Sequence, residues 1–289
     1  MHTRTFRAMN TDWWIGTPIA LDLAPFEALV HQAEQRYSRF LPGSALSRLN
    51  RERTLRDPVL AQLVRHALGM HEATGGAFDV RVGAALNAAG YDRTFERIAG
   101  LDARGGTSLL TFTPPLTALQ IDVCGDEVRL GGPGTIDLGG IAKGWTVDRV
   151  AEALEQAGGH DYLIDGGGDI RAAGRDERGE AWRVGVGEGL AVRLEHAAVC
   201  TSSTRRRRWQ AAGGDAHHII DPATGAPSRH TIAEAVVIAR EATLADVLAT
   251  TLIASPERGL ASLAAHGADA LVLRDGQWEM TEGMRLWLA

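Results

Sequence analysis

Residues 137–149 bring an aspartate, a glycine pair and a lysine close together, and this stretch constrains the chain more than any other. It runs Asp-Leu-Gly-Gly-Ile-Ala-Lys-Gly-Trp-Thr-Val-Asp-Arg. The pattern predicts a short apolar strand over 135–138, a Gly-Gly turn, and an amphipathic helix from about 141 to 157. Glycine lets the backbone approach a ligand closely, and a helix N-terminus attracts phosphate. With the charge of Lys143 at that end and Asp137 beside it, the stretch indicates a site for a phosphorylated ligand.

This stretch does not match the common nucleotide-binding motifs. A Walker A loop needs Ser or Thr directly after its lysine, and here Gly144 and Trp145 follow. The dinucleotide fingerprint Gly-x-Gly-x-x-Gly is also missing from the stretch. A strand, a glycine pair and a helix can equally form an ordinary tight turn. The functional interpretation therefore depends on the other motifs of the chain.

The composition is that of an ordinary globular protein, with 45% apolar and 23% charged residues among 289. The net charge of −6 argues against nucleic acid or an anionic membrane as the main partner. No stretch approaches the ~18 apolar residues that span a bilayer, and residues 1–11 lack an apolar secretory segment, so we expect a cytoplasmic protein with no membrane segment. Cys124 and Cys200 are interpreted as buried thiols of a reducing compartment.

Apolar periodicity predicts an alternation of helices and strands typical of an α+β fold. Helical spacing covers residues 23–38, 58–73 and 242–254. Ser44 is the expected N-cap of a short helical turn that follows a loop. Strands are expected over 119–123, 127–130, 162–165, 182–201, 233–239, 269–273 and 278–280. Because no repeat or linker interrupts the chain, we expect a single intertwined domain over 1–289, with helices packed on mostly antiparallel strands.

Asp246 and Thr250 lie four residues apart on a predicted helix, so their side chains project from one face. A carboxylate and a hydroxyl on one face are hard oxygen ligands of the kind that Mg²⁺ takes, with its other positions left for water and substrate phosphate. The alternative is an exposed aspartate beside a threonine that bonds back to its own helix. The spacing alone does not decide between the two.

Two histidines precede a strong turn signal in residues 217–225, His-His-Ile-Ile-Asp-Pro-Ala-Thr-Gly. The histidines could bind a metal, act as a base or contact phosphate, although such a pair is more often structural or exposed.

In residues 74–79, Thr-Gly-Gly-Ala-Phe-Asp, the aromatic ring either stacks on a planar ligand or fills the core after a helix end. Four arginines and a tryptophan in residues 205–209 indicate a solvated strand face, or an attraction for an acidic partner protein.

The order of these motifs resembles that of the ApbE family, the FAD:protein FMN transferases. The matching blocks cover nearly the whole chain and are residues 8–11, 37–40, 44–50, 74–79, 137–148, 167–169, 200–202, 218–225 and 244–250.

The resemblance implies an enzyme that uses FAD and Mg²⁺. It transfers the FMN half of FAD to a threonine or serine hydroxyl of a client flavoprotein, through a phosphoester bond, and releases AMP. The residues that would contact FAD are Met9, Phe40, Ala77, Phe78, Asp79, Asp137, Lys143 and Ile220. The groups that would hold magnesium are the Gly140 carbonyl, the Asp246 carboxylate and the Thr250 hydroxyl. His218 would lie near the diphosphate, and either His218 or Asp246 would accept the proton of the client hydroxyl.

The sequence departs from the family pattern at three points. Asn10 stands where the family usually has glycine, and Phe40 where many relatives have tyrosine. The usual Trp-Gly after the 74–79 block is replaced by Ala89-Gly90-Tyr91, so the flavin wall there is undetermined. Two alternatives to transfer remain open from sequence: a Mg²⁺-dependent FAD diphosphatase that yields FMN and AMP, and a non-catalytic FAD-binding protein.

Overall fold

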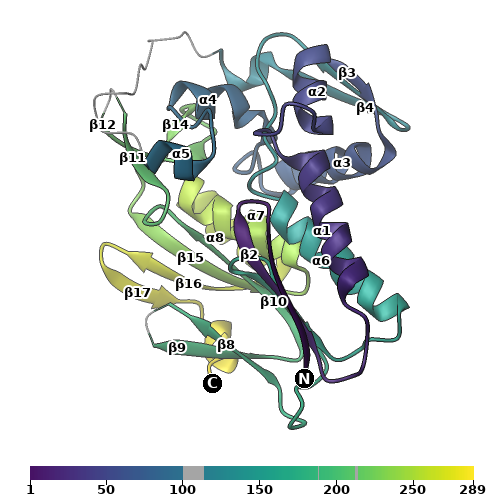
Figure 1. Ribbon diagram of the computed structural model, residues 1–289. Coiled ribbons are helices and arrows are strands. Elements are labelled where there is room, and N and C mark those ends of the chain that lie inside the picture. Colours follow the sequence, from purple (N-terminus) through teal and green to yellow (C-terminus); the bar gives the residue numbers. More distant parts are fainter. Residues whose placement is uncertain (100–113, 188, 212–213) are drawn as a thin grey trace.

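An antiparallel sheet forms the centre of the molecule (Figure 1). The computed structural model describes residues 1–99, 114–187, 189–211 and 214–289, and within these ranges eight strands pair in one sheet. Their spatial order is β1 (His2–Ala8), β2 (Thr11–Thr17), β6 (Tyr162–Asp165), β7 (Asp169–Ala173), β10 (His196–Ser203), β15 (Ile232–Ala239), β16 (Asp269–Arg274) and β17 (Gln277–Met280). Every neighbouring pair is antiparallel. Strands β10 and β15 lie in the interior of this order and are buried over most of their length, as expected where both faces of a sheet are covered.

Helices cover one face of this sheet. They are α1 (Ala24–Tyr37), α6 (Ala142–Gln156), α7 (Ala242–Ala254) and α8 (Pro256–His266). Helix α7 is apolar on nearly all sides, and such a helix must be buried on all sides. It packs on β10 and β15 beneath it and lies beside α6 and α8. Asp246 is therefore a carboxylate on the most enclosed helix of the fold.

Fewer elements cover the other face of the sheet. The hairpin of β8 (Trp182–Val186) and β9 (Leu190–Leu194) and the short helix η3 (Gly283–Leu286) pack there. Trp182, Val192 and Met284 are buried in the resulting core. This face contributes stability and lies away from the predicted site.

A second layer packs against the helices on the side away from the sheet. It contains α2 (Ala45–Glu52), α3 (Pro58–Ala73) and a small sheet of β3 (Thr54–Arg56), β5 (Glu127–Gly131) and β4 (Gln120–Cys124). Ser44 and Asp57 cap α2 and α3, since their side chains accept backbone N–H groups of the first turn. The remaining short elements are η1 (Val80–Val82), α4 (Gly83–Ala88), α5 (Phe95–Ala99), η2 (Leu116–Ala118), β11 (Arg208–Ala211), β12 (Gly214–His217), β13 (Ile220–Asp221) and β14 (Ala226–Pro227).

The predicted α+β class with mostly antiparallel strands is confirmed. The strand expected over 182–201 is divided among β8, β9 and the start of β10. Two further local predictions are wrong. Residues 135–138 form no strand. The Ile136 N–H donates to Asn50 Oδ1 at 2.8 Å, and the Asp137 N–H donates to Val80 O at 2.8 Å. These N–H groups therefore bond to a side chain and to a helical turn instead of to a neighbouring strand. Cys124 is exposed because it ends β4 on the outward-facing side, while Cys200 is buried. The expectation of one domain over 1–289 stays a prediction.

No helix in the described ranges combines the length and the apolar character needed to cross a membrane.

Candidate functional site

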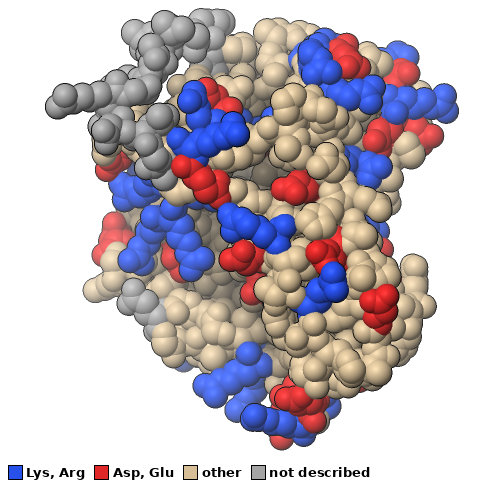
Figure 2. All heavy atoms as spheres, in the orientation of Figure 1, with Lys and Arg blue, Asp and Glu red and all other residues tan. Residues whose placement is uncertain are grey.

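A pocket of about 850 Å³ lies where the helices over the sheet meet the second layer. Figure 2 shows a hollow on this face of the molecule, bordered by acidic and basic side chains. The volume is in the range of ligand sites. Every residue predicted for FAD, metal or catalysis lines it: Met9, Phe40, Ala77, Phe78, Asp79, Asp137, Gly140, Lys143, His218, Ile220, Asp246 and Thr250. The structure thus brings together all of these residues, and their individual roles stay predictions.

The floor of the pocket is the junction of α6 and α7. A Cβ placed on Gly140, in the turn before α6, would lie 3.5 Å from the hydroxyl oxygen of Thr250 on α7. One turn earlier on α7, Asp246 Oδ2 accepts the backbone N–H of Gly144 at 3.1 Å. The Gly-Gly turn and the Asp246/Thr250 face therefore meet, although they are far apart in the sequence.

Lys143 also faces this junction, and its ammonium is paired with Asp169 at the start of β7. The carboxylate of Asp169 is almost completely buried. Burial by itself lowers the pKa of Lys143, but the charges of Asp169 and Asp246 outweigh it and the pKa is raised. Lys143 therefore stays a cation, as the prediction of a phosphate contact requires. From the sequence, Asp169 belongs only to the matching block 167–169, and no partner is predicted for it.

Asp246 lies in an environment that disfavours its negative charge. Burial, and then the carboxylate of Asp169, raise the pKa of Asp246 to about 7, against the opposing effects of Lys143 and of the Gly144 N–H. The two buried carboxylates, Asp169 and Asp246, thus face a single lysine. A further cation would neutralise the remaining negative charge. The described residues contain no cluster of three His, Cys, Asp or Glu side chains that could hold a metal. The donors at hand are a carboxylate, a hydroxyl and a backbone carbonyl, and this all-oxygen set fits Mg²⁺ rather than zinc.

Arg39, which was not predicted, organises one wall of the pocket. Its Nε lies 2.7 Å from Asp137 Oδ2, and its Nη1 donates to Asn87 Oδ1 at 2.8 Å. The guanidinium carbon lies 4.3 Å from the centre of the Phe40 ring and 4.9 Å from that of Tyr91, within the range of cation–π attraction. The negative charge of Asp137 is thus neutralised within the protein. No local pattern pairs residue 39 with residue 137, so this contact was beyond sequence reasoning.

Tyr91 fills the wall that the departure at residues 89–91 left open. Its ring stacks on Trp209 with centroids 5.3 Å apart and meets Phe40 edge-on at 5.5 Å. Trp209 Nε1 donates to the Ala89 carbonyl at 2.8 Å, which fixes the stack. Tyr91 and Phe40 both line the pocket. Trp209, at the end of the arginine run, therefore supports an aromatic wall rather than only a solvated strand.

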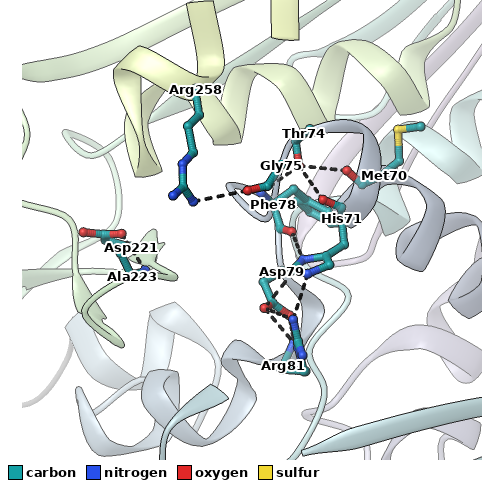
Figure 3. Close-up of polar contacts among 10 residues, drawn as sticks. All are labelled: Met70, His71, Thr74, Gly75, Phe78, Asp79, Arg81, Asp221, Ala223 and Arg258. Atoms are coloured by element: carbon teal, nitrogen blue, oxygen red, sulfur yellow. Dashed lines mark hydrogen bonds and ion pairs between the residues drawn. The ribbon is translucent and has the colours of Figure 1, made fainter. Parts of the chain in front are cut away.

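The turn over residues 74–79 is held by its own polar contacts (Figure 3). The Thr74 hydroxyl donates to Met70 O at 2.8 Å and accepts the Phe78 N–H at 3.1 Å. Gly75 and Gly76 take the positive φ angles, +59° and +81°, that reverse the chain after α3. Asp79 Oδ1 accepts the Arg81 backbone N–H at 2.9 Å, and its carboxylate pairs with the Arg81 guanidinium. These contacts hold Phe78 at the pocket. Asp79 also lines the pocket, and its carboxylate is already paired with the Arg81 guanidinium.

The two histidines of residues 217–225 have different surroundings. His217 Nε2 is 2.8 Å from Ser228 O and is structural. His218 lines the pocket, and its buried Nδ1 has no hydrogen-bond partner among the described residues. Burial, with the nearby positive charge of Arg207, lowers the pKa of His218 to about 3. The imidazole is therefore neutral at pH 7, with one ring nitrogen unpaired among the described residues.

The turn that follows is confirmed as a turn. Asp221 Oδ1 accepts the Ala223 N–H at 2.9 Å (Figure 3), and Asp221 O accepts the Gly225 N–H at 2.8 Å. This turn holds Ile220, which is buried, against the pocket.

Comparison with known proteins agrees with this arrangement. The sequence profile of the ApbE family matches residues 9–272. The FAD:protein FMN transferase of Haemophilus influenzae is 29% identical over 248 residues, which cover 78% of this chain and 70% of that protein. The protein of the same name from Treponema pallidum is 31% identical over 276 residues, 85% of this chain and 75% of that protein. The crystal structure of the ApbE protein of Thermotoga maritima has the same fold, with a TM-score of 0.82 at 24% identity, and the match covers 99% of this chain and 98% of that one. The resemblance inferred from the motifs is therefore confirmed, and the chain belongs to the ApbE family.

Proposed function

We propose that this protein transfers the FMN moiety of FAD to a serine or threonine hydroxyl of a client flavoprotein and releases AMP. The observation that carries the proposal is the meeting of Gly140, Asp246 and Thr250 at the floor of a pocket that Lys143 also lines. The prediction that the chain is an enzyme, a flavin transferase, is confirmed by its family and by the curated relatives of that name.

In the proposed reaction the client hydroxyl oxygen attacks the phosphorus of the FMN half. A new P–O bond forms, the P–O bond to AMP breaks, and the hydroxyl proton passes to a base. In this proposal Lys143 contacts the diphosphate oxygens that gain charge, and preorganised positive charge of this kind lowers the barrier to phosphoryl transfer.

Gly140, Asp246 and Thr250 would hold a magnesium ion through a carbonyl, a carboxylate and a hydroxyl oxygen. Bound there, the ion would supply neutralising charge to the diphosphate. Ser202 lies 3.1 Å from Thr250, hydroxyl to hydroxyl, and this contact orients the threonine side chain.

Two pocket groups are candidates for the base, His218 and Asp246. A carboxylate that holds a cation has a lowered proton affinity, so metal binding would weaken Asp246 as an acceptor. His218 has a buried Nδ1 without a partner among the described residues, but its lowered pKa makes the imidazole a weak base. We propose that one of these two groups accepts the hydroxyl proton.

The aromatic wall suits the isoalloxazine ring. Phe40 and Tyr91 present ring edges and faces to the pocket, and Phe78 lies next to the Gly140 turn, 3.4 Å from a Cβ placed on that glycine. Stacking of a planar ligand on aromatic rings adds to area burial. This arrangement would place the flavin at the wall and the diphosphate at the floor.

The test is incubation with FAD, Mg²⁺ and candidate client proteins, followed by mass spectrometry of the client. The expected result is a client mass increased by one FMN unit, and an equal amount of AMP. Asp246→Ala should abolish the product because it removes the charged metal ligand. AMP and free FMN without any client would instead indicate a diphosphatase, and FAD that stays intact with every client would indicate a binding protein.

Four finer points stay predictions. They are the dependence on magnesium, the serine or threonine acceptor, the release of AMP, and a cytoplasmic location. Omission of Mg²⁺ with EDTA present, and substitution of the acceptor residue in a flavinylated client, test the first two directly.

A further inference from the structure

Helices α6 and α7 cap each other. A helix leaves its first N–H groups without partners inside the helix, and a side chain near its own start usually accepts them. Ile141, the residue before α6, has no polar side chain to do this, and in the described structure Glu241 makes no such bond at the start of α7. Each helix instead receives a carboxylate from the other.

Asp148 of α6 caps α7. Its Oδ1 accepts the Ala242 N–H at 2.9 Å, and its Oδ2 accepts the Thr243 N–H at 2.8 Å and the Thr243 hydroxyl. The Asp148 side chain is only 3% exposed, so these bonds are shielded from water. A buried anion at a helix N-terminus also interacts favourably with the helix dipole. Asp148 thereby fixes the first turn of α7, and Asp246 lies on the next turn.

Asp246 of α7 caps α6 in return, through the Gly144 N–H. The two helices approach closely only because residue 144 is glycine. A Cβ there would lie 2.8 Å from the carbonyl carbon of Ala242 and 2.9 Å from the Cβ of Asp246. The carboxylate predicted to hold the metal is therefore one half of a reciprocal pair of caps, and Asp148 is the other half.

Strand β7 connects this pair to the sheet. Arg171 Nη1 donates to Asp148 Oδ1 at 2.7 Å, and Asp169, two residues earlier on the strand, pairs with Lys143. Alternate residues of a strand point to the same face, so both contacts reach α6 from one face of β7. The proposed reaction gives Asp148 no chemical task, yet this residue ties together all three elements that form the pocket floor.

We propose that Asp148 is a positioning residue for the metal and diphosphate site: by capping α7 from α6, it holds Asp246 and Thr250 against the Gly140 turn. The inference rests on the proposed function, since it concerns the same metal site. It predicts that Asp148 affects how much Mg²⁺ increases the affinity for FAD, and not the contacts with the flavin.

The experiment measures FAD binding by the change in flavin fluorescence, without client protein, once in EDTA and once in Mg²⁺. The ratio of the two dissociation constants is the gain in affinity that Mg²⁺ provides. In Asp148→Asn an amide NH₂ replaces one accepting oxygen and faces an N–H donor of α7. FAD affinity in EDTA should change little, while the gain from Mg²⁺ should fall about 10- to 100-fold, as for residues that orient metal ligands.

Asp57→Asn is the matched control. Asp57 accepts the Val59 and Leu60 N–H groups at the start of α3, at 3.0 and 2.9 Å, and pairs with Arg36, so like Asp148 it caps a helix and binds an arginine, but it does not line the pocket. This variant should lose helix capping and stability but keep the full gain from Mg²⁺. A loss of that gain in Asp57→Asn as well would mean that general destabilisation, and not position, explains the effect.

Two milder substitutions, both at Thr243, provide the test if Asp148→Asn fails to fold. Thr243→Val removes one bond to Asp148, whereas Thr243→Ser retains it; the gain should fall in the first and persist in the second. A full gain in both Asp148→Asn and Thr243→Val would overturn the inference while leaving the proposed function intact. Absence of any gain in the unchanged protein would contradict the metal-dependent function and the inference together.

Discussion

The floor and the wall of the pocket are built by different means. The floor consists of carboxylates and a lysine on two regular helices and the start of a strand, with their positions set by buried hydrogen bonds. The wall consists of aromatic rings and arginines from connecting segments, with Arg39 and Tyr91 at its centre. The floor resists displacement because each buried polar bond would leave an unpaired group if broken. The wall depends on stacking, which tolerates small shifts. The proposed function would use the floor for the chemistry that needs accurate geometry and the wall for recognition of the planar ring.

The largest expected effect tests the floor. In Gly144→Ala the added methyl group would overlap Ala242 and Asp246, so α6 and α7 must separate. Displacement of about 1 Å at a reactive site costs about 100-fold in rate, and overpacking costs about 1–3 kcal/mol of stability. Transfer rate and urea unfolding measure both.

Gly69→Ala is the control for this change. Gly69 also lies within a helix, and no heavy atom lies within 4 Å of a Cβ placed there. The methyl group should stabilise α3 by about 0.5–1 kcal/mol and leave transfer unchanged. Equal activity of the Gly144 and Gly69 variants would show that the close approach of α6 and α7 is unimportant for function.

The next effect concerns His218, whose ring centre lies 6.2 Å from that of Tyr91 in the wall. Its pKa is lowered to about 3 in the folded protein, against about 6.5 in an unfolded chain. Between these values the unfolded state binds more protons, so stability falls as pH decreases below about 6.5 and continues to fall towards 3. From pH 7 to pH 5 the loss from this group should be about 1–2 kcal/mol.

His218→Asn should remove that part of the acid sensitivity. Urea unfolding of both proteins at pH 7 and pH 5 provides the comparison. If the two proteins lose the same stability on acidification, the imidazole is not held in its neutral form by burial.

The smallest expected effect tests the wall. Tyr91→Ala removes the ring that stacks on Trp209 and meets Phe40, whereas Tyr91→Phe keeps both contacts. An aromatic pair contributes about 0.5–1.5 kcal/mol, so FAD affinity should fall about 2- to 10-fold in the first variant and stay nearly constant in the second. The gain from Mg²⁺ should be unchanged in both. A loss of that gain in Tyr91→Ala would mean that wall and floor are not separable.

Local patterns in the sequence predicted the floor well. The apolar periodicity located α3 and α7 at the boundaries that the structure shows, and the four-residue spacing of Asp246 and Thr250 predicted one shared face of α7, from which both residues line the pocket. These features depend on neighbours within one or two helical turns, which a linear pattern records.

The partners across the molecule could not be predicted in the same way. The pairing of Arg39 with Asp137, the stacking of Tyr91 on Trp209 and the capping of α7 by Asp148 each join residues that are distant in the chain. Residues 135–138 failed as a strand for a related reason: their apolar side chains are buried as expected, but a distant asparagine takes the place of a ladder. Burial follows from composition, whereas the choice of a hydrogen-bond partner follows from the assembled fold.

The exchanged caps also determine when the site can exist during synthesis on the ribosome. An emerging chain that stops before residue 242 contains the whole Gly-Gly stretch but not the carboxylate that completes the start of α6. Contacts between such distant positions form late, after most of the chain is available. On the proposed function, the nascent polypeptide should therefore bind FAD with the gain from Mg²⁺ only after α7 has been translated.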